Sequence, residues 1–529
     1  MSEVNDSSGQ SAAELLSSEL LDFCKYESLS EDGLREIIDR HGLTLSNNFP
    51  VSNYKFFRAA CSNERITEGI IRYLLECFPT PANVNFTGGW SPLHYACKNK
   101  NVTLNIIRRL VDAHPDSVRS VNNNGNTPLH FLCDTRQTDP AAAMRILRFL
   151  LEAHPEALRH ANNNGSLPIH MVASCWGKSH EFCGVLIEAY PGSERISNRN
   201  DALRGLLPFH FACIMNSVAT VEYLYDRYPD AIAVQGPNGL YPIHFAIKGI
   251  KLRENPATAA EIVQFLLDCA PNQKLVQSNG KSLLRYAFWQ EYDAPKIDAG
   301  IQIIKIIFDA HPEAIEDNLI APVIHHYHQE VQAFINNELV YARQAKDQRL
   351  MTTPNDDGRL PLHTAIQNNV TLGSIKLLVK GNPHAVQSPD NSGALPLHIA
   401  CEHHDSASVV EYLVELDTTT LDALDRDRNT ALHCACSGAK YDTIALLLGK
   451  YDAVSVSKRN AQYKLPIELL WESDQVDRES VEYTDSIFWL LKAHPETIMN
   501  GSMNMKEQVT SEERPSQNGK KRKYVDADA

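Results

Sequence analysis

Aliphatic residues recur along the chain with the spacing of an amphipathic helix, and most of these runs end shortly before a proline. One run holds Ile106, Ile107, Leu110 and Val111, and is followed by Pro115. Apolar residues at this spacing occupy one face of a helix, and proline cannot continue that helix. The pattern therefore predicts a series of short helices that each bury one face.

A second marker precedes each of these runs. The triplet Pro–hydrophobic–His occurs seven times, and an eighth copy has Ala in place of Pro. Successive motif histidines are 34 to 40 residues apart in the first five copies and 35 apart in the last three. A fixed period of this length indicates a repeat array. The motif histidines are His94, His130, His170, His210, His244, His363, His398 and His433.

The distances between the two markers also locate units that lack the histidine. Near residue 325, where the triplet is missing, Val331, Ile335 and Leu339 follow helical spacing. We therefore count twelve units, anchored near residues 58, 94, 130, 170, 210, 244, 285, 325, 363, 398, 433 and 468.

The segment Asn124–His130, which reads NGNTPLH, resembles the signature of the ankyrin repeat. By the spacing of the units, the resemblance covers about residues 52–499. It implies an all-α fold: an elongated solenoid of about twelve helix-turn-helix units with short turn or hairpin connectors. It also implies a long concave surface formed by first helices and turn tips, and a hydrogen bond between the motif Thr and the motif His.

The chain departs from that signature at two positions. The Thr is replaced by Tyr241 and by Leu at 167, 207, 360, 395 and 465, so these units are expected to lack the hydroxyl bond. The Gly that usually follows the first helix is replaced by Asn216 and Asn369. Asn is the next-best residue for a left-handed backbone, and we expect that conformation at both positions.

These markers divide the chain into five predicted parts. Residues 1–51 hold a disordered start and two capping helices, Ala12–Tyr26 and Glu31–His41, the second with Ser30 as its N-cap. Repeat blocks are expected at 52–315 and 354–499, separated by a degenerate unit with a long helix at 316–353. A disordered tail with a basic cluster is expected at 500–529.

The composition narrows the class of protein. Fifty basic and 65 acidic residues give a net charge of −15, which argues against direct nucleic-acid binding. The sequence has neither a signal peptide nor a run of roughly 20 apolar residues, so we expect no membrane span. The twelve Cys include no CxxC pair, which favours a reducing compartment, cytoplasmic or nuclear.

Candidate chemical sites are few. Motif histidines occur once per repeat, too far apart to share a metal, and neither His325–His328 nor His403–His404 has a known ligand spacing. Six Cys occupy one structural position, which indicates packing. Gly177–Ser179 and Gly280–Ser282 resemble the end of a phosphate-binding loop but lack its first Gly. We therefore predict no catalytic, cofactor or metal site.

The repeat array predicts a non-catalytic scaffold or adaptor that binds other proteins. Its candidate contact residues are the turn tips Asn123, Asn163, Asn238, Asp356, Asn391 and Asp427. The net acidity favours a partner with a basic surface. Two alternatives stay open: an enzyme or small-molecule binder with a hidden site, and a nuclear regulator that binds a transcription or chromatin factor. The latter rests on a candidate import signal, Lys520, Lys521, Arg522 and Lys523.

Overall fold

The computed structural model describes residues 12–26, 29–41, 54–78, 86–198, 205–270, 282–288, 290, 296–314, 329–451 and 456–493. The chain divides into two compact units, Met1–Leu339 (unit 1) and Val340–Ala529 (unit 2). The helices make up almost all of the regular secondary structure of the described residues, which also includes an isolated β-bridge between Phe86 and Trp90. The all-α repeat fold predicted from the sequence is confirmed.

Each repeat begins with a short first helix that starts at or next to the first position of the Pro–hydrophobic–His triplet. Proline suits this position because an N–H group there would have no partner within the helix. The first helices are α3 (Lys55–Ser62), α5 (Pro92–Lys98), α7 (Pro128–Asp134), α9 (Pro168–Ser174), α11 (Pro208–Met215), α13 (Pro242–Gly249), α15 (Leu283–Phe288), α20 (Pro361–Gln367), α22 (Pro396–His403), α24 (Ala431–Ser437) and α27 (Pro466–Glu472).

The second helix of each repeat carries the apolar run, most of which is buried, although Leu416, Phe488 and Trp489 are exposed. These helices are α4 (Glu68–Cys77), α6 (Leu104–Ala113), α8 (Pro140–Ala153), α10 (His180–Ala189), α12 (Val218–Arg227), α14 (Ala257–Cys269), α16 (Ile297–Ala310), α21 (Leu372–Gly381), α23 (Ala407–Leu416), α25 (Tyr441–Leu448) and α28 (Val481–Ala493). Short 3₁₀ helices, most of them starting at a proline, follow several of them: η2 (Pro115–Arg119), η3 (Pro155–Arg159), η4 (Ser193–Arg195), η5 (Pro229–Ala233), η6 (Pro237–Gly239), η8 (Pro312–Ala314), η10 (Pro383–Gln387) and η11 (Thr418–Asp422).

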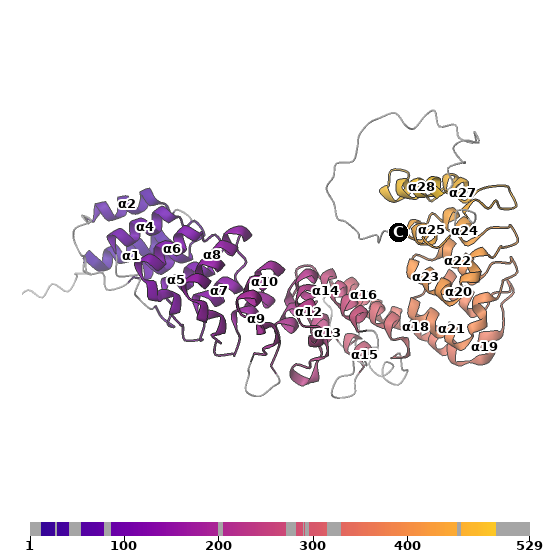
Figure 1. Ribbon diagram of the computed structural model, residues 1–529, viewed down its shortest axis with the longest axis horizontal. Helices are drawn as coiled ribbons and strands as arrows, with labels where there is room; N and C mark the ends of the chain where they lie inside the picture. The colour runs from indigo at the N-terminus through magenta and orange to yellow at the C-terminus, as the bar shows by residue number, and fades with distance from the viewer. Residues whose placement is uncertain are drawn as a thin grey trace, which may run out of the picture. The chain divides into compact units, whose positions relative to one another are not determined.

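The repeats stack in two rows within each unit (Figure 1). In unit 1, α5 packs on α7 and α7 on α9, while α6 packs on α8 in the row of second helices. In unit 2, α22 packs on α24 and α24 on α27, with α23, α25 and α28 in the second row. The connectors that lead into the first helices lie on the first-helix side. Most contacts are therefore between neighbouring repeats, as in other repeat proteins.

Four helices lie outside this pairing. At the start, α1 (Ala12–Lys25) packs on α3 and α2 (Glu31–Arg40) on α4, and the Ser30 Oγ caps α2 by accepting the Gly33 N–H at 3.2 Å. The two predicted helices therefore cover the first repeat. The long helix expected within 316–353 is α18 (Gln329–Lys346), followed by α19 (Gln348–Thr352). The boundary between the units falls inside α18.

The motif histidines fasten each first helix to its surroundings. The Nδ1 atom of His130 accepts the Thr127 N–H at 3.2 Å and lies 2.9 Å from the Thr127 hydroxyl. Its Nε2 atom lies 3.1 Å from the carbonyl of Ser166 in the next connector. Where Leu replaces Thr, as at Leu167, only the backbone N–H bond to Nδ1 of His170 remains, at 3.1 Å. The predicted loss of the hydroxyl bond is confirmed.

This bonding pattern keeps the ring neutral. At His94, His130, His170 and His210 a backbone N–H points at Nδ1 and a carbonyl oxygen faces Nε2, so the tautomer with hydrogen on Nε2 satisfies both, whereas His244 has only the N–H at Nδ1. Burial in the repeat core disfavours the charged form. It lowers the pKa to about 4 at five histidines of unit 1: His94, His130, His170, His210 and His244.

The prediction of a left-handed backbone at two asparagines is right at one and wrong at the other. Asn369 has φ +55°, whereas Asn216 is extended, with φ −100° and ψ −179°. The fully buried Asn216 amide instead donates to the carbonyls of Val172, Ala173 and Cys175 at 3.0 to 3.3 Å. These carbonyls lie at the end of α9, beyond the last regular helical hydrogen bonds, and those of Val172 and Cys175 also accept the N–H groups of Cys175 and Lys178 at 3.1 and 3.2 Å. A tertiary contact therefore fixes the Asn216 backbone.

The cysteines at the shared structural position are packing residues. Each of the six is fully buried, beside the first helix of a neighbouring repeat. Burial raises the pKa of each thiol, which keeps it protonated and unreactive. The six are Cys61, Cys97, Cys133, Cys213, Cys401 and Cys436.

Candidate protein-binding surface

A single Asn or Asp side chain shapes most connectors that lead into the first helices. In Asn122, the Oδ1 atom accepts the backbone N–H groups of Asn124 and Asn126 at 3.0 and 2.9 Å. The residue lies eight positions before the motif His or its equivalent, and the same pattern recurs at Asn162, Asn355, Asp390 and Asn460. The sequence analysis did not predict this Asn or Asp, although its fixed distance of eight residues from the motif His could have identified it.

Neighbouring connectors are hydrogen bonded to one another at their tips. The Asn123 N–H donates to the carbonyl of Gly88 at 2.8 Å, and the Asn163 N–H to that of Asn124 at 3.0 Å. In unit 2 the same bond joins Asn391 to Asp357, Arg426 to Ser392 and Ala461 to Asp427. These bonds hold successive tips in a fixed register, so the side chains they display form an ordered row.

All six residues predicted to contact a partner are exposed at these tips. They differ in what else they do. The side-chain amides of Asn163 and Asn391 donate to the preceding tip, at the carbonyls of Asn123 (2.8 Å) and Asp356 (3.0 Å). Asn238 has a left-handed backbone, with φ +58°. The contact of these residues with a partner stays a prediction.

Beside the tips, each first helix presents two positions, the first and fourth after the motif His, which we call the first-helix face. In unit 1 the first position carries Tyr95, Phe131, Met171, Phe211, Phe245 and Tyr286. Four of these rings meet the motif His of the preceding repeat edge-on, with centroid separations of 4.9 to 5.8 Å. This aromatic row was not predicted.

Unit 2 presents a different first-helix face. Its first position carries Thr364, Ile399, Cys434 and Leu469, and its fourth carries Gln367, Glu402, Ser437 and Glu472. In unit 1 the fourth position carries two exposed cations, Lys98 and Lys248, together with Asp134, Ser174 and Ile214. The first-helix faces of the two units therefore differ in chemistry. The face of unit 1 carries aromatic rings and two exposed lysines, whereas the face of unit 2 has no aromatic residue at these positions and carries two glutamates.

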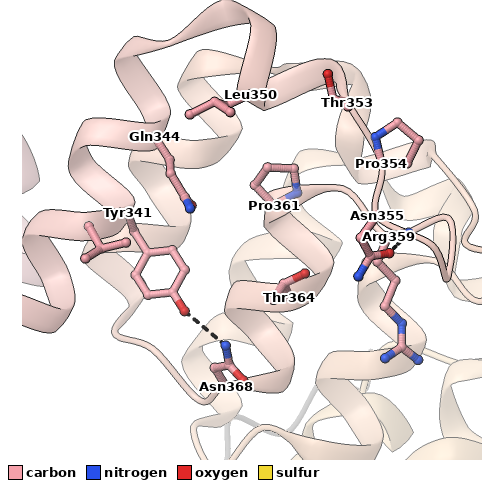
Figure 2. A pocket seen from close by; sticks show the side chains of 11 residues that line it. Tyr341, Gln344, Leu350, Thr353, Pro354, Asn355, Arg359, Pro361, Thr364 and Asn368 are labelled. Carbon is pink, nitrogen blue, oxygen red and sulfur yellow. Dashed lines mark hydrogen bonds between the residues drawn. The ribbon is translucent and has the colours of Figure 1, made fainter.

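A pocket of about 450 Å³ lies in unit 2 between the end of α18, α19 and the start of α20 (Figure 2). Its ionisable side chains are Tyr341, whose hydroxyl accepts the Asn368 amide at 3.1 Å, and Arg359, which donates to Asp390 at 3.0 Å. An acid–base pair of the kind hydrolytic enzymes use is therefore missing from its lining. The lining residues are Val340, Tyr341, Gln344, Leu350, Thr353, Pro354, Asn355, Arg359, Pro361, Thr364 and Asn368.

The motifs weighed for metal or phosphate binding have structural roles where the structure describes them. Within the described residues, no group of three or more His, Cys, Asp or Glu is arranged to hold a metal ion. His404 is buried and bonds the Val370 carbonyl at 2.9 Å. The Lys178 amine donates to Gln137 and lies over the Phe182 ring. Ser282 caps the start of α15, where its Oγ accepts the Arg285 N–H at 3.2 Å, while residues 280–281, 325–328 and 520–523 lie outside the described residues.

Residues 56–145, 323–422 and 371–460 match the family model of ankyrin repeats in three copies. These parts of the chain are therefore ankyrin repeats, which confirms the resemblance seen in the motif around His130. A search of curated proteins finds no significant match. Ankyrin repeats are in general protein–protein interaction modules without catalysis of their own. Among the described helices, none is both long and apolar enough to cross a membrane.

Proposed function

We propose that this protein is a non-catalytic scaffold or adaptor that binds other proteins through its connector tips and first-helix faces. The supporting observation is the hydrogen-bonded row of tips, which displays exposed side chains on a frame that is already ordered. A preordered surface loses less conformational entropy when it binds a partner. The net charge of −15 speeds encounter with a basic partner, most directly at the acidic tips Asp356 and Asp427.

A tip variant tests this proposal. The substitutions Asn123→Lys, Asp356→Lys and Asp427→Lys alter three exposed tip side chains and leave the bonds between the tips in place. We expect affinity purification of the full chain followed by mass spectrometry to recover specific partners with the wild type. We expect the tip variant to recover smaller amounts of those partners, because the three new lysines repel a basic partner surface.

A matched control places the same change in charge on the second helices. Ala153, Glu411 and Glu415 are exposed on α8 and α23, and replacing all three with Lys adds as much positive charge as the tip variant does. This control should retain the partners, and its circular dichroism spectrum should match that of the wild type. Equal loss in both variants would show that net charge, and not the tips, governs binding.

A nuclear role is a second proposal, carried by the basic cluster at residues 520–523. Four consecutive cations in an acidic chain are typical of a nuclear-import signal. A fluorescent fusion of the full chain should accumulate in the nucleus, and replacement of Lys520, Lys521, Arg522 and Lys523 by Ala should shift it to the cytoplasm. An unchanged distribution would remove the support for a nuclear regulator and leave the scaffold proposal intact.

A further inference from the structure

A cluster of cations and aromatic rings covers part of the first-helix side of unit 1. The Arg58 guanidinium lies over the Tyr95 ring at 5.9 Å, and the Lys98 amine lies over Trp90 at 5.4 Å. One repeat further on, the Arg136 guanidinium lies 4.4 Å from the centroid of Trp176. We call these six residues the basic–aromatic patch. Its cations come from three successive repeats: Arg58 lies in the middle of α3, Lys98 ends α5, and Arg136 follows α7.

The cations of the patch are held by ring faces rather than by carboxylates. Within the described residues, no carboxylate lies within ion-pair distance of Arg58, Lys98 or Arg136. Asp134, at the end of α7, has an electrostatic interaction with Lys98 but forms no ion pair with it. Among the second helices of the same repeats, Arg109 is paired with Glu68 at 3.1 Å, whereas Arg108 lies over the Phe149 ring. The patch therefore keeps its positive charge available.

The aromatic residues of the patch are half-buried and rigidly packed. Trp90 lies 4.3 Å from Phe131 and 4.8 Å from Tyr95, measured between ring centroids. Trp90, Tyr95 and Trp176 each keep part of their surface exposed. Trp, Tyr and Arg are the residues most often found at the energetic centre of a protein interface. Rings already fixed by packing lose little freedom when a partner covers them.

We propose that the basic–aromatic patch binds an acidic peptide segment of a partner protein. Carboxylates of the segment would pair with Lys98 and Arg136, and its apolar side chains would cover Trp90 and Tyr95. The inference rests on the proposed scaffold function and assigns the chemistry of one partner site. A nucleic acid fits less well, because its continuous phosphate charge would run beyond the patch onto a chain of net charge −15.

Selection from a random dodecapeptide library on the full chain tests the inference. Enriched peptides should carry net negative charge together with aromatic or aliphatic residues. Their affinity, measured by fluorescence anisotropy, should fall as the salt concentration rises, because the contact includes exposed ion pairs. Enrichment of neutral or basic peptides, or no enrichment at all, would overturn the inference. So would tighter binding of a single-stranded oligonucleotide of equal length.

Charge reversal locates the site of binding. The double variant Lys98→Glu/Arg136→Glu should weaken the enriched peptides roughly tenfold or more, and Lys98→Gln/Arg136→Gln should weaken them less. The matched control is Arg108→Glu/Arg148→Glu, which reverses two exposed cations on the second helices α6 and α8 and changes the net charge equally. The control should bind as the wild type does.

The two proposals fail in different ways. If the peptides bind the double variant as well as the wild type, the patch is not their site, while the scaffold proposal stands. If the full chain captures no partner but the acidic peptides bind and respond to the double variant, the patch is a binding site and the wider surface proposal fails. Thermal melting of the variants excludes unfolding as the cause of any loss.

Discussion

Lowering the pH from 7.5 to 5 is expected to reduce the free energy of unfolding of unit 1 by several kcal/mol. Five buried histidines there have a pKa of about 4 in the folded state against 6.5 for an unperturbed side chain. By proton linkage, each of these rings lowers the free energy of unfolding at pH 5 by about 2 kcal/mol relative to pH 7.5. The combined effect is comparable with the whole stability of a typical domain.

The direction of this effect follows from where protons bind. Between pH 6.5 and about pH 4 the unfolded chain takes up protons on these rings, while the folded chain keeps them neutral. The stabilisation is complete above pH 6.5 and is lost as the pH falls toward 4. Protonation would also place a hydrogen on Nδ1, against the backbone N–H that the ring now accepts.

Urea unfolding at pH 7.5, 6 and 5, followed by circular dichroism, measures the loss, and hydrogen exchange assigns it to the helices of unit 1. The variant His210→Gln removes one of the five titrating rings. It should lower stability at pH 7.5 and reduce the slope of stability against pH by about 1 kcal/mol per pH unit between pH 5 and 6. Equal wild-type stability at pH 7.5 and pH 5 would contradict the role assigned to burial.

Replacing Asn216 with Leu is expected to cost about 3 kcal/mol of stability. The side chain is fully buried and of similar size to Leu, so the change leaves little void. It removes the side-chain donor of the Ala173 carbonyl, a second donor of the Val172 and Cys175 carbonyls, and the acceptor of the Ser217 N–H, at 2.8 Å. Buried polar groups left without partners carry the full cost of their lost hydration.

The control for this prediction is Asn123→Leu, because Asn123 is exposed at a connector tip. Surface changes of this kind usually alter stability by no more than about 0.5 kcal/mol. Thermal and urea unfolding of both variants would separate the two environments. A loss at Asn216 no larger than that at Asn123 would mean that these carbonyls find other donors, for example in water.

The helical repeat could be predicted from the sequence because its signals are local. Proline at the start of a first helix and the aliphatic spacing of a second helix act within one repeat, so the marker distances located α3, α15 and α27 without a motif His. The same reasoning placed α18 through Val331, Ile335 and Leu339, all of which are buried. Exposure of the connector tips followed from their turn residues.

The candidate surface was only partly predictable. The tips carry turn residues, which can be identified in the sequence. The basic–aromatic patch instead depends on contacts between different repeats, of Arg58 with Tyr95 and of Arg136 with Trp176. Nothing in the order of residues along one repeat shows which side chain of the next repeat it will meet. The stacking of the repeats creates these pairs.

The sequence by itself determined that this chain is a stack of helical repeats, with exposed tips and buried Cys and His at fixed positions. The tertiary structure decided what the periodicity leaves open: the extended backbone of Asn216, the neutral state of the motif histidines and the contrast between the first-helix faces of units 1 and 2. The physical reason is that helix formation depends on neighbours along the chain. Hydrogen-bond partners, burial and ring contacts depend on the repeat packed alongside.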